Sequence, residues 1–304
     1  MTSTANDTPR TPQRVLVTGA TGKLGRAVVR HLRDVGLDVL AVDRAAAADA
    51  RDVSGEFLLC DLTDYGQALE AVTGTVDEHG PVDAVVHLAA VPAPGLRPNA
   101  ATFANNATAT YNVFAACRAA GVKQVVWASS ETVLGLPFDT LPPYAPVDEE
   151  YAPRPESTYS LAKALEEEMA RHFCRWDPEL VMVGLRFSNV MDVEDYAAFP
   201  SFQDDPQLRR WNLWGYIDAR DGAQAVERGL RHDVPGAEVF VIANADTVML
   251  RPSAELMAEV FPDVPLRREV AGTETLLGID KARRVLGYEP RHSWRDHVEG
   301  ARDA

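Results

Sequence analysis

The sequence is poor in cysteine, and the spacing of its cysteines excludes several classes of protein. Only three of the 304 residues are cysteine, at Cys60, Cys117 and Cys174. An odd number at wide spacing provides neither a disulfide framework nor a metal-binding pattern. We therefore expect buried free thiols in a reducing compartment and no metal site.

Long apolar runs and an excess of positive charge are also missing. No apolar run reaches the roughly 18 residues of a membrane-spanning helix, and no charged-then-apolar leader opens the chain. The chain has 30 Lys and Arg against 45 Asp and Glu, a formal net charge of −15. This acidity disfavours nucleic acid and anionic membranes as partners. We expect a soluble, cytoplasmic protein that binds a small molecule.

What the sequence does have, from residue 14 onward, is an alternation of apolar and amphipathic segments. Strands are expected at 15–17, 38–42, 56–60, 83–88, 124–128, 180–187 and 238–243. Helices are expected at 23–34, 101–120, 157–176, 221–231, 253–260 and 280–286. Continuous apolar strands that alternate with helices indicate an α/β fold with a parallel sheet covered on both faces. The proline-rich segment 137–155 is predicted to be a loop, and 189–212 irregular.

Three glycines lie between the first predicted strand and the first predicted helix. Gly19 would allow the tight turn out of the strand, Gly22 the close approach of a pyrophosphate, and Gly25 the packing of helix on sheet. The N-terminus of the helix then offers unpaired N–H groups to the phosphates. The position of the glycines between strand and helix predicts a dinucleotide-binding turn.

A carboxylate ends the second predicted strand, about 20 residues further on, where such a turn needs one. Asp43 could accept hydrogen bonds from the hydroxyls of the adenine ribose. Because it would repel a 2′-phosphate, NAD is favoured over NADP. The neighbouring Arg44 leaves residual use of NADP open. The alternative to a ribose-binding role is that Asp43 is a solvated acid at the end of a strand.

A second group of residues predicts proton transfer. Tyr159 and Lys163 lie four residues apart on a predicted helix, so they share a face. A nearby ammonium would lower the pKa of the phenol and make the tyrosine usable as an acid or base near neutral pH. Ser130 ends the fifth predicted strand, at the sheet edge where open α/β folds bind ligands. A Tyr-x-x-x-Lys pair on its own usually has a structural role. The glycine turn and the serine support a catalytic role for this pair.

With these residues in place, the chain resembles an extended short-chain dehydrogenase/reductase of the NAD-dependent epimerase/dehydratase family. The resemblance covers residues 14–294. It rests on TGATGKLG at 18–25, DL at 61–62, HLAA at 87–90, ASS at 128–130, YSLAK at 159–163, LRFSN at 185–189 and YIDARD at 216–221. It implies a Rossmann-type doubly wound parallel sheet with a small C-terminal substrate lobe. The expected parts are a mobile tail (1–13), an NAD-binding domain with the catalytic residues (14–187) and a substrate-binding lobe interleaved with late sheet elements (188–304).

The resemblance implies roles residue by residue. Tyr159 would be the acid/base, Lys163 would hold the nicotinamide ribose, and Ser130 would bind the substrate oxygen. The positions implied to bind NAD are Gly19, Thr21, Gly22, Lys23, Leu24, Gly25, Asp43, Asp61, Leu62, Leu88, Ala89, Ala90, Asn106, Ala128, Ser129, Tyr159, Lys163, Phe187 and Ser188. The positions expected at the substrate are Ser130, Glu131, Thr132, Asn189 and Arg186.

Two departures from the family pattern narrow the activity. Family dehydratases carry an Asp-Glu pair after the catalytic hydroxyl residue, where this chain has Glu131 and Thr132. The short segment 189–216 also leaves little chain for a nucleotide pocket, which favours a free sugar or sugar acid. In this compactness the chain is similar to uronate dehydrogenases. An anionic substrate could pair with Arg186, Arg209, Arg210 or Arg220, although each is more simply a structural or exposed arginine.

Three functions remain open at this point. The first is an NAD-dependent dehydrogenase that oxidises a hydroxyl of a sugar-like substrate, and the second is an NAD-dependent sugar epimerase. The third, a non-enzymatic sensor of dinucleotides, is disfavoured because Ser130, Tyr159 and Lys163 are all present. The apolar faces of the helices at 101–120 and 157–176 resemble a family dimer interface, so we expect a homodimer.

Overall fold

A seven-stranded parallel sheet forms the centre of the computed structural model, which describes residues 12–46, 55–74 and 79–301. The strand order is β3-β2-β1-β4-β5-β6-β9, and all neighbouring pairs are parallel. The strands are β1 (Arg14–Thr18), β2 (Asp38–Asp43), β3 (Phe57–Leu59), β4 (Ala84–His87), β5 (Gln124–Ser130), β6 (Val181–Phe187) and β9 (Gly236–Ile242). The order turns back between β1 and β4, which confirms the predicted Rossmann-type fold.

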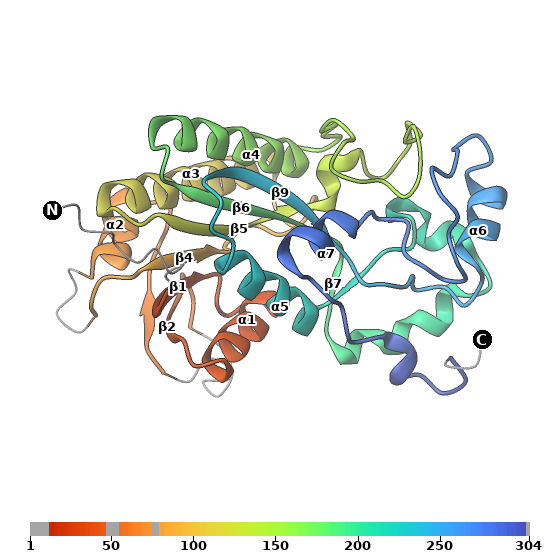
Figure 1. Ribbon diagram of the computed structural model, residues 1–304, viewed down its shortest axis with the longest axis horizontal. Coiled ribbons are helices and arrows are strands. Elements are labelled where there is room, and N and C mark those ends of the chain that lie inside the picture. The colour runs from red at the N-terminus through yellow and green to blue at the C-terminus, as the bar shows by residue number, and fades with distance from the viewer. Residues whose placement is uncertain (1–11, 47–54, 75–78, 302–304) are drawn as a thin grey trace, which may run out of the picture.

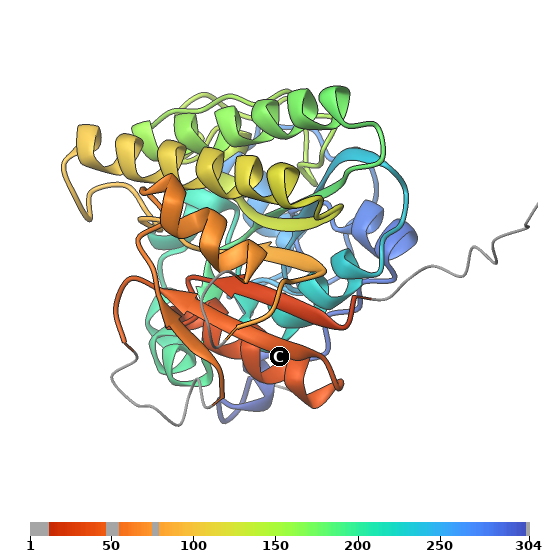
Figure 2. The ribbon, with the colours of Figure 1, turned by 90° about the vertical axis from the view of Figure 1, so that its left-hand side faces the viewer.

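Helices cover both faces of the sheet (Figures 1 and 2). One layer consists of α2 (Tyr65–Thr73), α3 (Asn99–Ala120) and α4 (Thr158–Trp176). The other consists of α1 (Lys23–Asp34) and α5 (Ala219–Leu230), which pack side by side. Because side chains alternate along a strand, Val15 and Val17 enter the core on one face and Leu16 the core on the other. Strands buried on both faces must be apolar throughout, as their sequences are.

The C-terminal part adds short elements beyond the carboxyl ends of the strands. They are β7 (Val190–Met191), the 3₁₀ helices η2 (Val193–Phe202) and η3 (Pro206–Asn212), β8 (Ile217–Asp218), α6 (Ser253–Val260), α7 (Asp280–Leu286) and η4 (Trp294–Asp296). Aromatic side chains hold this region: the ring of Phe199 lies 5.5 Å from Tyr216 and 5.4 Å from Trp294, both edge to face.

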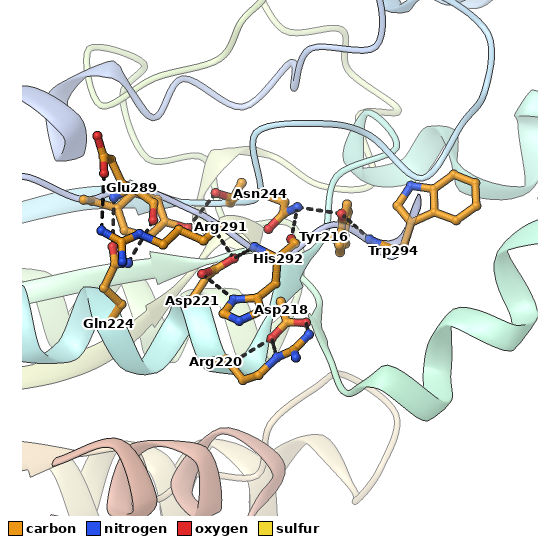
Figure 3. Close-up of polar contacts among 12 residues, drawn as sticks. Tyr216, Asp218, Arg220, Asp221, Gln224, Asn244, Glu289, Arg291, His292 and Trp294 are labelled. Carbon is orange, nitrogen blue, oxygen red and sulfur yellow. Dashed lines mark hydrogen bonds and ion pairs between the residues drawn. The ribbon is translucent and has the colours of Figure 1, made fainter. Parts of the chain in front are cut away.

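Hydrogen bonds fasten the end of the chain to α5 (Figure 3). The Asp221 carboxylate accepts from the backbone N–H groups of Arg291 and His292 and from the His292 ring, at 2.8–3.0 Å. Gln224 exchanges two hydrogen bonds with the backbone of Glu289. The motif at 216–221 therefore supports the C-terminal part and does not face a ligand.

Most predicted elements are found within one to three residues of their expected bounds. The segment predicted to be irregular contains β7, η2 and η3, which have little periodicity because they follow the shape of the core. The predicted tail lies outside the described residues up to Thr11, but Pro12 is buried and Gln13 donates to Asp83 at 3.0 Å. Among the described helices, none is long and apolar enough to cross a membrane.

Candidate active site

The loops that leave β1, β4, β5 and β6 surround a cleft of about 640 Å³ at the carboxyl edge of the sheet. Of the positions predicted for cofactor or substrate, all but two line it. Those that do are Gly19, Thr21, Gly22, Lys23, Leu24, Gly25, Asp43, Asp61, Leu62, Leu88, Ala89, Ala90, Ala128, Ser129, Ser130, Glu131, Thr132, Tyr159, Lys163, Phe187, Ser188 and Asn189. Asn106 and Arg186 do not.

The glycine turn has the shape that a pyrophosphate requires. Gly19 has a positive φ of 66°, and a Cβ there would lie 2.8 Å from the backbone nitrogen of Ala89. A Cβ at Gly25 would lie 2.1 Å from the carbonyl oxygen of Gly19, so helix and turn touch. Gly22 begins α1 without any side chain capping its first N–H groups. The free N–H groups and the missing Cβ leave a cradle that fits a dinucleotide phosphate.

Asp43 ends β2 beside this turn. Its Oδ2 accepts hydrogen bonds from the backbone N–H and the hydroxyl of Thr21, at 3.0 and 2.7 Å. Its Oδ1 accepts from the backbone N–H of Arg44 at 2.7 Å. The carboxylate therefore lies at the cleft wall with its orientation held from two sides, where ribose hydroxyls could also donate to it.

Asp61 forms the next part of the wall. Its carboxylate accepts from the backbone and the hydroxyl of Thr63, at 2.9 and 2.7 Å, and these hydrogen bonds lower its pKa. Leu62 beside it is buried, and its carbonyl oxygen accepts from Asn112 on α3. This end of the cleft has an ionised acid and an apolar side chain, as an adenosine site needs.

Asn106 has a different place from the predicted one. It is fully buried in α3, where its amide pairs with the backbone of Val91: Oδ1 accepts from the N–H at 2.8 Å and Nδ2 donates to the C=O at 3.1 Å. It therefore supports the loop after β4 from behind, and its neighbour Asn105 lines the cleft instead. Spacing alone could not distinguish these two adjacent asparagines.

Local structure places the tyrosine opposite the serine. Ser157 and Ser160 form a capping box at the start of α4, with hydrogen bonds of 3.1 and 2.8 Å, which holds Tyr159 in the first turn. Ser130 is the last residue of β5, and its hydroxyl lies close enough to the Tyr159 phenol to lower the pKa of that phenol. Thr132 adds a second hydroxyl, which donates to the Ser130 Oγ at 3.0 Å. Three hydroxyl groups thus meet at one point of the cleft.

Lys163 lies on the same face of α4, one turn further. Its Nζ donates to the carbonyl of Ala128 at 2.8 Å and to Glu166 at 2.9 Å. Burial would lower the pKa of Lys163, but Glu166, Tyr159 and Glu167 together outweigh it and raise that pKa. The lysine is therefore held as an ammonium beside the phenol.

The expected lowering of the tyrosine pKa is not the net result in this structure. Burial raises the pKa of Tyr159, and the opposing effects of Lys163 and of the Ser130 hydrogen bond do not overcome it. Glu166 adds to the rise because its negative charge lies near the phenol. Sequence spacing identified the ammonium but not the degree of burial or the acid behind it.

Glu166 was missed as a site residue, although it is completely buried against Lys163. Burial raises the pKa of Glu166, against the lowering effects of Lys163 and of Thr110 on α3. The Thr110 hydroxyl also lies 3.1 Å from the ring of His87, whose other nitrogen meets Thr18 at 2.8 Å. Burial, with the charge of Lys163, lowers the pKa of His87 to about 3, so the ring is neutral. In the sequence, the signal for Glu166 was an acidic residue three positions after Lys163, on the same face of the helix.

Glu131 is the second buried acid of the site. Its carboxylate accepts from the Ser188 hydroxyl at 2.6 Å and from the Asn212 amide at 3.1 Å. Burial raises the pKa of Glu131 to about 7, against the lowering effect of these hydrogen bonds and of Arg209. This carboxyl group directly follows the serine and lines the cleft.

The predicted partner for a substrate anion, Arg186, lies elsewhere. It is buried behind β6, where it donates to both oxygens of Glu167 at 2.9 and 2.8 Å. Ser129 donates to the same carboxylate at 2.6 Å, which fixes the end of β5. Arg186 is therefore a structural residue. The other three candidates, Arg209, Arg210 and Arg220, do not line the cleft either.

The sheet order, the glycine turn and the Ser–Tyr–Lys group together define an NAD-dependent enzyme of the short-chain dehydrogenase/reductase type. Residues 15–203 match the model of the NAD dependent epimerase/dehydratase family. The chain belongs to this family, and its cofactor is NAD.

Relatives within the family have different activities. The chain is 31% identical to a uronate dehydrogenase of Pseudomonas syringae pv. tomato over 247 residues, 79% of this chain and 78% of that protein. It is 30% identical to an NAD-dependent glucose-6-phosphate dehydrogenase of Haloferax volcanii over 291 residues, 92% and 93% of the two chains. A crystal structure of a UDP-galactose 4-epimerase is similar with a TM-score of 0.66 and 26% identity, covering 92% and 94%. The chain is thus an NAD-dependent sugar oxidoreductase or epimerase.

Proposed function

We propose that this protein is an NAD-dependent dehydrogenase that oxidises a hydroxyl group of a free sugar or sugar derivative. The supporting observation is that the C-terminal lobe contributes little wall to the cleft. Of the described residues that follow Asn189, only Val190 and Trp211 line it. A nucleotide-sugar substrate would need further groups to hold its nucleotide. The cleft suits a smaller molecule next to the nicotinamide.

In this mechanism NAD supplies the hydride acceptor when it is bound. The cradle at Gly22 would hold the pyrophosphate and Asp43 the adenine ribose, while Lys163 would face the second ribose. The Ser130 hydroxyl donates to the substrate oxygen and holds it beside Tyr159. The Tyr159 phenolate then takes the hydroxyl proton as hydride leaves the same carbon. The site contributes position and proton transfer.

Lys163 would stabilise the phenolate form that this step needs. The charge of Lys163 is balanced by Glu166, and burial keeps the phenol protonated at neutral pH. The proposal therefore predicts that activity increases toward alkaline pH, because the pKa of Tyr159 is raised. A rate of oxidation that is unchanged from acidic to alkaline pH would contradict this role of the tyrosine.

The second candidate is a sugar epimerase, because the same residues could return the hydride to the other face of an oxidised carbon. The similarity to the UDP-galactose 4-epimerase structure favours it. The two functions differ in whether the reduced cofactor is released. A dehydrogenase releases one NADH for each substrate oxidised, whereas an epimerase keeps NAD bound and shows no net NADH.

A panel of aldoses, uronates and modified sugars with NAD or NADP, followed by the absorbance of the reduced cofactor, tests the proposal. Parallel chromatography of the sugars and release of NAD from denatured protein test the epimerase. The Tyr159→Phe variant should lose activity by about 10²- to 10⁴-fold, the usual contribution of a positioned acid/base. It should still bind NAD, measured by calorimetry. Full activity of Tyr159→Phe would overturn both functions.

We also propose that the protein acts as a homodimer through α3 and α4. On this surface Tyr111 of α3 and Leu161, Leu165 and Trp176 of α4 are exposed, each by 41–51%. Large apolar side chains gathered on neighbouring helices are typical of a surface that another chain covers.

A further inference from the structure

The part of the cleft left for the substrate is walled by uncharged residues and one acid. Beyond the positions that fit NAD, its lining consists of Pro92, Ala93, Pro94, Ser130, Glu131, Thr132, Asn189, Val190 and Trp211. Among these described residues none is a cation. A carboxylate or phosphate bound here would therefore meet only uncharged groups and the Glu131 carboxyl group.

The cations that do line the described cleft each have a partner. Lys23 is paired with Asp195. Lys163 donates to Glu166 and to a backbone carbonyl. The third, Arg44, lies beside Asp43 at the ribose end.

Two nearby arginines have partners outside the cleft, although Arg186 Nη1 and Arg209 Nε are buried without a hydrogen bond to any described residue. Arg186 is bound to Glu167 on the far side of β6. Arg209 donates to the carbonyl of Gly215 at 3.0 Å, and its guanidinium lies 4.9 Å from the ring centre of Trp211. Neither of the two arginines is part of the described lining, although the charge of Arg209 acts on the Glu131 carboxyl group.

Glu131 is built into the site with its position fixed. It is 3% exposed, and two donors from different segments, Ser188 after β6 and Asn212 in η3, hold its two oxygens. With the backbone N–H of Asn189 also facing it, the carboxylate keeps a further lone pair, since it offers about four acceptor sites. A group that donates a hydrogen bond would satisfy this capacity, whereas a second negative charge would be repelled in a site with little water.

We propose that Glu131 selects an uncharged sugar, one that presents a hydroxyl donor and not a carboxylate or phosphate next to the reacting carbon. The inference rests on the proposed function and narrows it to neutral sugars or polyols. It separates this chain from the two relatives above, whose names give them uronate and a sugar phosphate. Glu131 acts as a specificity-determining residue of the same cleft.

The selection should depend on pH in one direction. The groups that face the Glu131 carboxyl are the Ser188 hydroxyl, the Asn212 amide, the backbone N–H of Asn189 and the charge of Arg209, and its pKa is raised to about 7. Above that pH the group is an anion and repels an acidic substrate. Below it the neutral form can donate to such a substrate, so discrimination against acids should weaken at low pH.

Pairs of ligands that differ only in charge provide the test. The NAD-loaded wild type is titrated calorimetrically with glucose and glucuronate, and with galactose and galacturonate, at pH 6 and pH 8. The same pairs are assayed for formation of NADH. At pH 8 we expect each neutral sugar to bind about tenfold or more tightly than the uronate of the same pair, because like charges repel in a buried site.

Glu131→Gln removes the charge and nearly keeps the shape. It should reduce the preference for the neutral sugar by about tenfold, and the remaining preference should no longer change between the two pH values. Glu150→Gln, which removes an exposed acid paired with Arg267, is the matched control and should leave the preference unchanged.

The outcomes separate the two proposals. If the wild type binds the uronates as tightly as the hexoses, or if Glu131→Gln leaves the ratio unchanged, the role of Glu131 is wrong while NADH formation still supports the dehydrogenase. If neutral sugars bind with the expected preference but no NADH appears and the sugar is epimerised, the dehydrogenase fails and the selection stands. If none of the four sugars binds, the assignment to neutral hexoses is overturned.

Discussion

At the scale of single residues, the site depends on where each charge is balanced. Lys163 has Glu166, Arg186 has Glu167, and Asp43 has the donors of Thr21. Lys163 and Glu166 are buried in the same helix, whereas the other two pairs join segments that are distant in the sequence. A substitution that keeps the shape and removes one charge therefore tests a role without emptying the core.

Asp43→Asn should shift the choice of cofactor. The neutral amide no longer repels a 2′-phosphate and makes a weaker hydrogen bond to the ribose. Loss of a charge-assisted hydrogen bond costs about 1.5–3 kcal/mol, so the KM for NAD should rise by about ten- to a hundredfold while that for NADP falls. Steady-state kinetics with both cofactors measure this. Asp34→Asn, at an exposed position of α1, should change neither value.

Glu166→Gln should move the pH profile to lower pH. The Glu166 charge raises the pKa of Tyr159 and the Lys163 ammonium lowers it, so removing the acid lowers the pKa of the phenol at every pH at which Lys163 stays protonated. The phenolate then forms at lower pH, and the rise of kcat/KM with pH should occur earlier. Glu168→Gln, an exposed neighbour, is the control. A profile that stays in place, with NAD binding intact, would make Glu166 a purely structural residue.

At the scale of the elements, close packing between neighbouring strands sets the position of the catalytic strand β5. Trp127 of β5 is completely buried and lies over Gly184 of β6, where an added Cβ would come within 2.5 Å of the indole ring. Three residues further along, β5 ends at Ser130. The missing side chain at Gly184 therefore allows the strands to pair in the register that presents the serine.

Gly184→Ala should destabilise the fold. Overpacking of a close-packed core costs about 1–3 kcal/mol, because the indole has no free space into which to move. Urea denaturation followed by circular dichroism measures the loss in the free energy of unfolding. Gly80→Ala, where nothing lies within 4 Å of the added atom, should have little effect. Equal stability of the two variants would show that the sheet adapts at this point.

At the scale of the whole molecule, the cleft is closed by parts that are far apart in the chain. The paired side chains Lys23 and Asp195 join the phosphate turn to η2, and Arg26 lies 3.5 Å from Asp192. The C-terminal lobe thus holds the start of α1 as well as the substrate side. Binding of NAD to this closed cleft should stabilise both parts together.

The homodimer belongs to the same scale. Leu165→Glu places a charge in the middle of the exposed apolar surface of α4, and burying it without a partner would be costly. We expect the variant to be a monomer in size-exclusion chromatography with light scattering, where the wild type is a dimer. Leu208→Glu, at an exposed leucine of η3, is the control. A monomeric wild type would remove the proposal.

Local sequence determined the order of strands and helices, the glycine turn and the Ser–Tyr–Lys group, because each follows from spacing within one or two elements. Gly19, Gly22 and Gly25 lie within seven consecutive residues. Tyr159 and Lys163 lie one helical turn apart. Such features keep their geometry wherever the elements pack.

Only the tertiary structure decided which charges face the cleft. Arg186 looked available for an anion, but Glu167 holds it behind the sheet, and Asn106 supports a loop instead of the cofactor. Glu166 became a site residue because burial places it against Lys163, whereas Glu131 was expected at the substrate from the sequence and burial decided only its raised pKa. The physical reason is that the balance of buried charges depends on partners from distant segments, which no local pattern of sequence contains.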